Sequence, residues 1–382
     1  MVSSFGENMQ KFTMCAPCLF GLEKLVANEL KFMGAENVTA ENGRVLFKGG
    51  YDILIRANIR SRFAERIVVL LGEFTARSFE ELFNGVEKLP FENFILENEA
   101  FPVSGATLDS KLYSVPDCQK IIKKAVCKRL SRIRKTDWLN ESGGVHQIKF
   151  LIRKDKASIM LDTTGTGLYK RGYRAESNSA PIKETLAAAM VDLSKVRKDH
   201  YVVDPMCGSG TILIEAALAA MKIFPGAERS FAAENWACIP KELWEKERES
   251  ARAMRITDCN FKATGFDIDA ESLRIAKSNA KKAGVDDRIT FIQQDVKDFI
   301  PSEERGTLIT NPPYGERMLS INEAEELYYT MGKRFKKKQG WSYAIITPDD
   351  DFEKCFGRIA DKRRKLYNGM LKCQFYMYFK TE

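Results

Sequence analysis

A polar, proline-rich segment follows an apolar run late in the chain. The apolar run is Thr307–Ile309, and the segment contains Asn311, Pro312, Pro313 and Tyr314. An exocyclic amine on a nucleobase is a weak nucleophile because its lone pair is delocalised into the ring, so a catalyst must hold the nitrogen with its lone pair directed outward. The Asn311 side-chain oxygen and the Pro312 carbonyl can each accept one amine N–H, the prolines restrict the backbone, and Tyr314 offers a ring for stacking. These residues predict chemistry on a planar amine, although a proline-rich turn after a buried strand would also fit them.

A Gly-rich turn upstream suggests the second substrate. His200–Val203 has the pattern of a buried strand, Asp204 stands at its end, and Ile212–Met221 has helical periodicity. The glycines allow close approach to a ligand, but no Lys follows as a phosphate-binding loop requires, and the spacing is not Gly-x-Gly-x-x-Gly. Such a cradle suits S-adenosylmethionine, with Asp204 facing its ammonium directly or through water. The cofactor contacts expected in the turn are Pro205, Met206, Cys207, Gly208, Ser209, Gly210 and Thr211.

Two further strands end in acidic residues. Asp267 and Ile268 follow Thr264–Phe266, and Asp269 is placed to cap a helix over Ala270–Ala283. An acid at the second strand end usually takes ribose hydroxyls, so Asp267 is the ribose candidate.

The third strand runs from Arg288 to Asp295 and Val296, which puts Asp295 where it can accept the adenine amine. Each acid alone would also fit a cap or a loop position. Because ligands of an open parallel sheet bind along the carboxyl edge, the series Asp204, Asp267, Asp295 and Asn311 predicts one continuous site with methyl transfer as its chemistry.

These motifs carry a family resemblance. Residues 164–382 resemble a class I S-adenosylmethionine-dependent methyltransferase, through Asp204–Thr211, Gly265–Asp269 and Asn311–Gly315. Lys170–Ala175 and Ala180–Ala189 resemble the segment that packs beside the cofactor in THUMP-domain RNA guanine-N2 methyltransferases. This resemblance implies cofactor contacts for Glu184 and Thr185, and a Rossmann-like α/β fold.

The resemblance covers nearly the whole chain and is strongest to the bacterial branch that modifies guanine in large-subunit ribosomal RNA. Some members of that branch carry a second methyltransferase domain. This chain stops at Glu382, so we expect the activity of such a second domain to be absent.

Composition limits the class of protein. The 382 residues suffice for two or three domains, and 44% hydrophobic with 29% charged residues is ordinary for a globular chain. No apolar run approaches a membrane span and the first residues lack a secretion signal, so we expect a cytoplasmic protein without a membrane partner.

Cysteine and histidine usage argues against metal and disulfide chemistry. Nine cysteines at irregular spacing favour a reducing compartment. Cys15 and Cys18 alone could form a redox pair or half a zinc site, but no second Cys pair has ligand spacing, and His146 and His200 are the two histidines. We expect no metal.

Positive charge is concentrated in one segment. The net charge is +8, and between Lys111 and Lys135 nine basic residues face Asp117 alone. Apolar residues recur at helical spacing there, which predicts an amphipathic helix with a basic outer face. A solvated helix face is the alternative to phosphate contact, which we favour. The expected RNA contacts are Lys111, Lys120, Lys123, Lys124, Lys128 and Arg132.

The N-terminal half predicts two α+β units. Alternating patterns give strand, helix, hairpin, helix and strand over Lys11–Leu71, the ferredoxin-like order, with Arg62–Leu71 as its last strand. A second unit closes with a hairpin turning at Lys154-Asp155, and resembles a THUMP domain, a module associated with structured RNA. The expected division is 1–75 ferredoxin-like, 76–163 THUMP and 164–382 methyltransferase.

The catalytic half should hold a seven-stranded sheet with one antiparallel strand and an added helix over Lys241–Arg255. We favour S-adenosylmethionine-dependent methylation of a guanine N2 amine in structured RNA, with ribosomal RNA as the first candidate and no obligate protein partner. The alternatives are guanine N2 methylation of transfer RNA, adenine N6 methylation of nucleic acid, and a noncatalytic RNA-binding assembly factor.

Overall fold

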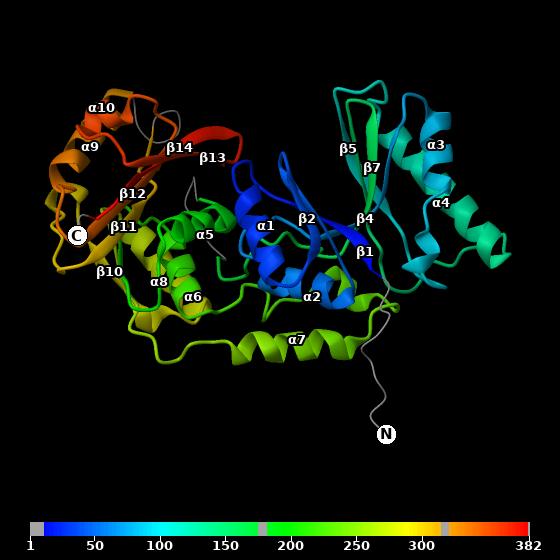
Figure 1. Ribbon diagram of the computed structural model, residues 1–382, viewed down its shortest axis with the longest axis horizontal. Coiled ribbons are helices and arrows are strands. Elements are labelled where there is room, and N and C mark those ends of the chain that lie inside the picture. The colour runs from blue at the N-terminus through cyan, green and yellow to red at the C-terminus, as the bar shows by residue number, and fades with distance from the viewer. Residues whose placement is uncertain (1–10, 175–181, 315–320, 381–382) are drawn as a thin grey trace.

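The computed structural model describes residues 11–174, 182–314 and 321–380. Figure 1 shows an elongated molecule with two sheets, the catalytic half at one end, the THUMP helices at the other and the ferredoxin-like helices between them. No helix of the described residues is long and apolar enough to cross a membrane.

The first sheet begins as a ferredoxin-like unit. Its elements in chain order are β1 (Phe12–Pro17), α1 (Glu23–Phe32), β2 (Glu36–Glu41), β3 (Arg44–Gly49), α2 (Tyr51–Arg60) and β4 (Val68–Thr75). This is the β-α-β-β-α-β order predicted from the sequence. Gly43 turns the β2–β3 hairpin at a φ of +77°, a left-handed conformation that glycine adopts without a steric penalty.

The predicted strand over Arg62–Leu71 is wrong in its first half, because β4 begins only at Val68. The residues before Val68 form a loop whose side chains contact the catalytic half. Arg62 Nη2 donates to the carbonyls of Leu218 and Ile223, at 3.2 and 3.0 Å. These contacts hold the loop in a non-strand path that its apolar pattern does not reveal.

The same sheet continues into the THUMP unit. That unit contains α3 (Phe79–Glu87), η1 (Phe91–Asn93), β5 (Val103–Leu108), α4 (Val115–Arg134), β6 (Ile148–Arg153) and β7 (Lys156–Asp162). β4 pairs antiparallel with β7, and the sheet order is β2-β3-β1-β4-β7-β6-β5. The two N-terminal units therefore share one continuous sheet.

The catalytic half forms the second sheet. Its elements are α5 (Glu184–Leu193), β8 (Tyr201–Asp204), α6 (Thr211–Ala220), η2 (Ala232–Asn235), α7 (Lys241–Ala253), β9 (Lys262–Asp267), α8 (Ala270–Lys282), η3 (Asp286–Arg288), β10 (Ile289–Gln293), η4 (Val296–Asp298), β11 (Gly306–Thr310), α9 (Ile321–Arg334), β12 (Trp341–Thr347), α10 (Phe352–Phe356), β13 (Lys362–Asn368) and β14 (Leu371–Tyr378).

Seven strands lie in the order β10-β9-β8-β11-β12-β14-β13, and β14 runs antiparallel to both of its neighbours, as the sequence predicts. The chain leaves β8 toward β9 on one side and returns to β11 on the other. This reversal of strand order makes the carboxyl end of β8 the place where a ligand is expected in an open α/β sheet.

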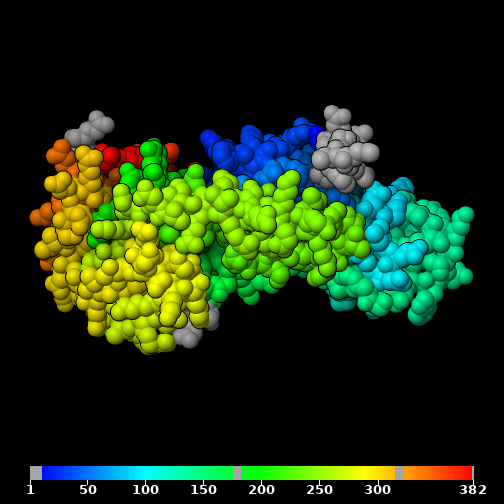
Figure 2. All heavy atoms as spheres, turned by 90° about the horizontal axis from the view of Figure 1, so that it is seen from below, coloured from blue at the N-terminus to red at the C-terminus, as the bar shows by residue number. Residues whose placement is uncertain are grey.

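Helix α7 joins the two halves. It lies beside α2 (Figure 1), and Glu247 of α7 forms ion pairs with Arg56 and Arg60 of α2. In Figure 2 the segment that includes α7 spans the middle of the molecular face between the catalytic and THUMP ends. Trp244 of α7 and Trp236, which lies shortly before this helix, are both buried. These two aromatic side chains therefore pack inside the protein.

Candidate active site

The polar strand ends predicted from the sequence share one edge of the catalytic sheet. Asp204 ends β8, Asp267 ends β9, and Asn311 directly follows β11. β8 pairs in parallel with both β9 and β11, so their carboxyl ends lie side by side. Asp295 follows the end of β10, the strand beyond β9.

Asp204 lies inside the protein at this edge, with 1% of its surface exposed. Its Oδ1 accepts hydrogen bonds from the Thr310 hydroxyl at 2.7 Å and the Met206 amide at 3.2 Å. Desolvation raises the pKa of Asp204 to about 7, although both hydrogen bonds favour the ionised form. The carboxyl thus ties the Gly-rich turn to β11, and a cation arriving beside it would stabilise its charge.

The Gly-rich turn packs closely on the neighbouring strand. Gly208 and Gly210 have φ values of +51° and +78°, which strain any residue with a Cβ. A Cβ on Gly210 would come within 3.1 Å of Ala276 and 3.2 Å of Phe291. The Cys207 amide donates to the Phe266 carbonyl at 2.8 Å. The two glycines therefore keep the turn narrow at the place where the cofactor's amino acid moiety is expected.

Asp267 braces that turn from β9. One carboxylate oxygen accepts from the Gly208 amide at 2.8 Å and the other from the Asp269 amide at 3.0 Å. These bonds hold the carboxylate at the sheet edge, and a ribose contact by Asp267 stays a prediction. Ile268 presents an apolar side chain to solvent at the same edge, where an adenine ring could cover it.

Asp269 caps α8, as predicted, and accepts the amides of Glu271 and Ser272 at 3.2 and 3.0 Å. Asp295 caps the short helix η4 through the Lys297 amide at 2.9 Å and pairs with the Lys297 ammonium at 3.1 Å. An adenine contact by Asp295 stays a prediction, and it would share the carboxylate with Lys297. Val296 is buried beneath it.

Glu184 and Thr185 open α5, which packs against α6, the helix that follows the turn. The buried Glu184 carboxyl pairs with Arg174 at 2.8 Å, and desolvation raises its pKa to about 7 despite this partner. The Thr185 hydroxyl donates to Glu65 of the ferredoxin-like unit at 2.6 Å. Cofactor contacts by both residues stay predictions. Sequence reasoning missed Glu65 because no local pattern links it to a segment more than a hundred residues away.

The proline-rich segment leaves a polar atom without a partner. Asn311 Oδ1 is buried and accepts no hydrogen bond from the residues that the structure describes. Pro312 is buried, and the Tyr314 hydroxyl accepts from Asn368 Nδ2 at 2.8 Å. A buried carbonyl oxygen without a donor costs about 1–3 kcal/mol, and a donor that bound there would relieve this cost.

Comparison with known families identifies the domains of the chain. Three family models match the chain: an RlmL ferredoxin-like domain over residues 13–68, a THUMP domain over residues 76–162, and an RMKL-like methyltransferase domain over residues 171–377. The chain belongs to the RMKL-like methyltransferase family. It is therefore an RNA methyltransferase that depends on S-adenosylmethionine, with the Rossmann-like fold expected from its sequence.

The relatives of this methyltransferase fall into two classes by chain length. It is 43% identical over 373 residues to "Putative RNA methyltransferase YpsC" of Bacillus subtilis, with 97% of each chain covered. It is 35% identical to the ribosomal RNA large subunit methyltransferase K/L of Psychromonas ingrahamii, over 94% of this chain and 49% of that protein. The chain thus spans about half the length of the K/L relatives.

Two solved structures resemble the methyltransferase closely. SMU.472, solved in complex with SAH, has a TM-score of 0.94 at 42% identity and covers 98% of this chain and 99% of its own. A protein of Listeria monocytogenes, described as a predicted N6-adenine-specific DNA methylase, has a TM-score of 0.91 at 41% identity, with 99% of this chain and 100% of its own covered.

The basic helix of the methyltransferase is less one-sided than its sequence suggests. Acidic residues distant in sequence neutralise part of it. Lys123 pairs with Glu141 and its ammonium lies 3.5 Å from the centre of the Phe101 ring, while Lys128 and Arg132 share Glu87 at 3.2 and 3.6 Å. RNA contact by the six predicted residues stays a prediction. Of these six, Lys111, Lys120 and Lys124 are exposed and form no ion pair with Glu141 or Glu87.

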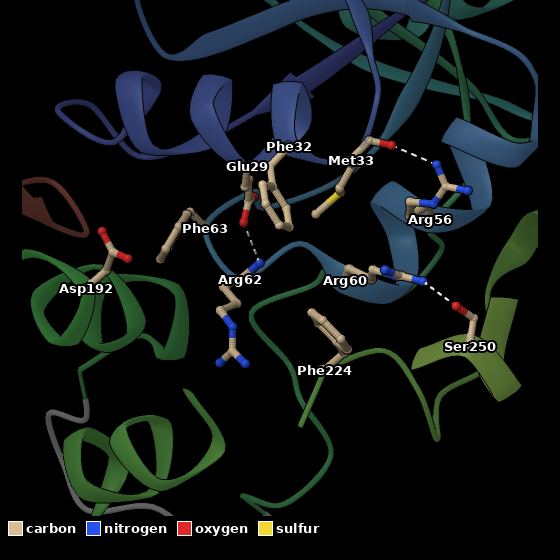
Figure 3. Close-up of a pocket in the computed structure, with 10 residues that line it drawn as sticks. All are labelled: Glu29, Phe32, Met33, Arg56, Arg60, Arg62, Phe63, Asp192, Phe224 and Ser250. Carbon is tan, nitrogen blue, oxygen red and sulfur yellow. Dashed lines mark hydrogen bonds between the residues drawn. The ribbon is translucent and has the colours of Figure 1, made fainter. Parts of the chain in front are cut away.

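A cavity of about 430 Å³ lies between the two halves (Figure 3). Arg60 points across it to Ser250, with a 3.0 Å hydrogen bond, and Arg62 binds carbonyls at the far end of α6. Because α6 starts at the carboxyl end of β8, its far end lies at the opposite edge of the sheet. The cavity is therefore part of the junction and lies away from the candidate active site.

Proposed function

We propose that the chain transfers the methyl group of S-adenosylmethionine to the exocyclic N2 amine of a guanine in structured RNA, with ribosomal RNA as the substrate. The observation that carries the proposal is the buried Asn311 Oδ1, which has no donor among the described residues and stands at the carboxyl end of β11. A primary amine has the two N–H groups that this oxygen and the Pro312 carbonyl would accept.

The residues around the Gly-rich turn fit the cofactor. The turn approaches a ligand with backbone alone, Asp267 offers ribose acceptors, and Asp204 offers a carboxylate for an ammonium. When bound, S-adenosylmethionine supplies an electrophilic methyl group on a sulfonium. Each of these contacts is part of the proposal.

Asn311 and Pro312 would orient the target amine. Two acceptors that take both amine hydrogens fix the plane of the N–H bonds and turn the nitrogen lone pair toward the methyl donor. Tyr314 would stack on the base. No strong base is needed, because the amine becomes acidic as it gains the methyl group and its proton can leave late to water. Asn311 Oδ1 accepts a hydrogen bond from one N–H until water takes the proton.

The N-terminal half favours RNA over DNA. The THUMP match and the K/L relatives support an RNA substrate, and those relatives are named for large-subunit ribosomal RNA. The same two acceptors would also orient an adenine N6 amine, as the name of the Listeria neighbour suggests for that protein. The family resemblance favours guanine, and a cytoplasmic location fits a ribosomal RNA substrate.

Comparison of modified nucleosides in RNA from a wild-type strain and a deletion strain tests the proposal. Large-subunit ribosomal RNA and transfer RNA are purified separately, digested and analysed by mass spectrometry. The proposal expects loss of one N2-methylguanosine from the ribosomal fraction. Loss of N2-methylguanosine from transfer RNA would reassign the substrate, and loss of N6-methyladenosine would reassign the base.

A further inference from the structure

The turn of the last hairpin reaches the proline-rich segment. Asn368 ends β13, Leu371 begins β14, and these two residues pair across a tight turn in which Gly369 has a φ of +66°. Asn368 Nδ2 donates to the Tyr314 hydroxyl at 2.8 Å. Tyr314 follows two prolines in a segment without regular secondary structure, and this contact is one of those that hold its side chain.

The hairpin is itself held from behind by the ferredoxin-like unit. Arg364 Nη2 donates to the Gly21 carbonyl at 2.7 Å, and the Tyr367 and Phe20 rings meet edge to face at 5.7 Å. Figure 1 shows β13 extending from the catalytic sheet toward α1 and β2. The turn therefore has a defined position between the N-terminal half and the proline-rich segment.

The exposed side of this turn is apolar at its tip and basic along its strands. Met370 is 99% exposed and Leu371 is also exposed, while Lys365 and Lys372 point to solvent on the two strands. A fully exposed Met at a tight turn gains nothing from folding. Apolar tips flanked by cations are suited to contact bases beside a phosphate backbone, where the side chain covers a base face.

We propose that the β13–β14 turn forms the rim of the base site, where Asn368 is a positioning residue for Tyr314 and Met370 contacts the RNA nucleotide next to the target base. This inference rests on the proposed function, because it takes the occupant of the site to be a base of RNA. Asn368 acts on the reaction through Tyr314, and Met370 acts on RNA affinity.

A double-mutant cycle tests the positioning role. Asn368→Ala should lower kcat for methyl transfer about tenfold with unchanged S-adenosylmethionine affinity. Asn368→Asp should restore part of the rate, because its carboxylate can accept a hydrogen bond from the Tyr314 hydroxyl and so keep the two side chains linked. In a Tyr314→Phe background, which lacks the hydroxyl, Asn368→Ala should change nothing further. Equal losses in both backgrounds would overturn the positioning role.

Hydrogen exchange gives a readout that needs no activity. Peptides covering residues 308–314 should exchange faster in Asn368→Ala and in Tyr314→Phe, and at the wild-type rate in Ile359→Ala. Ile359 is a matched control, because it is an apolar residue that is 76% exposed on the loop before β13. Unchanged exchange in Asn368→Ala would overturn the inference even if the wild-type chain acted on another substrate.

Met370→Ala tests the contact with RNA. Large-subunit ribosomal RNA purified from a deletion strain serves as the probe. The variant should raise KM and the filter-binding Kd for this RNA about fivefold, with unchanged kcat and cofactor affinity, whereas Ile359→Ala should leave all of these values as in wild type. Equal RNA affinity in wild type and Met370→Ala would overturn the contact. Absence of methyl transfer by the wild-type chain would instead reject the proposed function. The binding and exchange data would still show whether Met370 contacts RNA and whether Asn368 positions Tyr314.

Discussion

At the scale of single residues, Asp204 carries a conflict between folding and ligand binding. Its carboxyl is buried at the end of β8, and desolvation raises its pKa to about 7. An ionised carboxylate there is costly without a cation and useful with one. The acids at the strand ends could be predicted from the sequence, because a polar residue after an apolar run is a local signal. The contacts of Asn368 and Glu65 could not be predicted, because their partners lie far away in the chain.

Asp204→Asn should stabilise the cofactor-free protein at high pH. Because the folded pKa lies above the unfolded value of about 3.9, the folded state holds the proton more tightly and wild-type stability declines as pH rises from about 4 to 7. At pH 8 the variant should be more stable by on the order of 2 kcal/mol, and at pH 5 the difference should be much smaller. Urea unfolding of both proteins at the two pH values measures this. A difference that does not grow with pH would contradict the burial argument.

Cofactor affinity should show the opposite trend with pH. If Asp204 faces the ammonium, S-adenosylmethionine binds the ionised carboxylate, and affinity should rise about tenfold from pH 5.5 to pH 7 as the group ionises. Calorimetry should find this rise abolished in Asp204→Asn. Glu184 also has a pKa raised to about 7, so Glu184→Gln serves as the control that separates the two carboxyls. A rise that survives in Asp204→Asn would assign the ammonium contact elsewhere.

At the scale of helices and strands, local signals predicted most elements well. The order of the ferredoxin-like unit, the Asp269 cap and the start of α7 at Lys241 all follow from local polar, capping or apolar patterns in a few residues. The predicted start of β4 was wrong, because contacts between the preceding loop and the catalytic half override the strand pattern. The sequence overstates the unpaired positive charge on α4, because the acidic residues that pair with it lie in other parts of the chain.

Charge reversal on α4 and just before it tests the role of this helix in RNA binding. Lys111→Glu, Lys120→Glu and Lys124→Glu together should weaken binding to ribosomal RNA and reduce the slope of log Kd against log salt by about 0.7 to 0.9 for each phosphate that the variant no longer binds. Filter binding across salt concentrations measures the slope. The matched control is the same reversal at three exposed lysines of α8, Lys277, Lys281 and Lys282. Equal slopes in both triple variants would make α4 an ordinary solvated face.

At the scale of the whole molecule, the N-terminal half supports the catalytic half directly. One hydrophobic core extends from the first sheet through α5 and α6 to the second sheet. Glu65 of the ferredoxin-like unit binds Lys183 at 3.0 Å and Thr185 at 2.6 Å, at the start of α5. The N-terminal half therefore holds the start of α5 in place in the catalytic half.

Glu65→Ala should weaken S-adenosylmethionine binding although Glu65 belongs to the ferredoxin-like unit. Removal of its carboxylate frees the first turn of α5, the helix that packs against α6. We expect a three- to tenfold rise in the cofactor Kd, equivalent to about 1 kcal/mol. Calorimetry measures it, with Glu36→Ala as the control, because Glu36 pairs with Lys11 at the surface. Equal affinity in Glu65→Ala and wild type would confine cofactor binding to the catalytic half.

Transfer of an isotopically labelled methyl group tests the central claim most directly. Ribosomal RNA from a deletion strain is incubated with the purified chain and S-adenosylmethionine carrying a deuterated methyl group, and its nucleosides are then identified by mass spectrometry. The wild-type chain should place the label in N2-methylguanosine, and Asn311→Ala should do so about 100-fold more slowly with nearly unchanged cofactor affinity. Label in N6-methyladenosine, or an Asn311→Ala variant as active as wild type, would contradict the account.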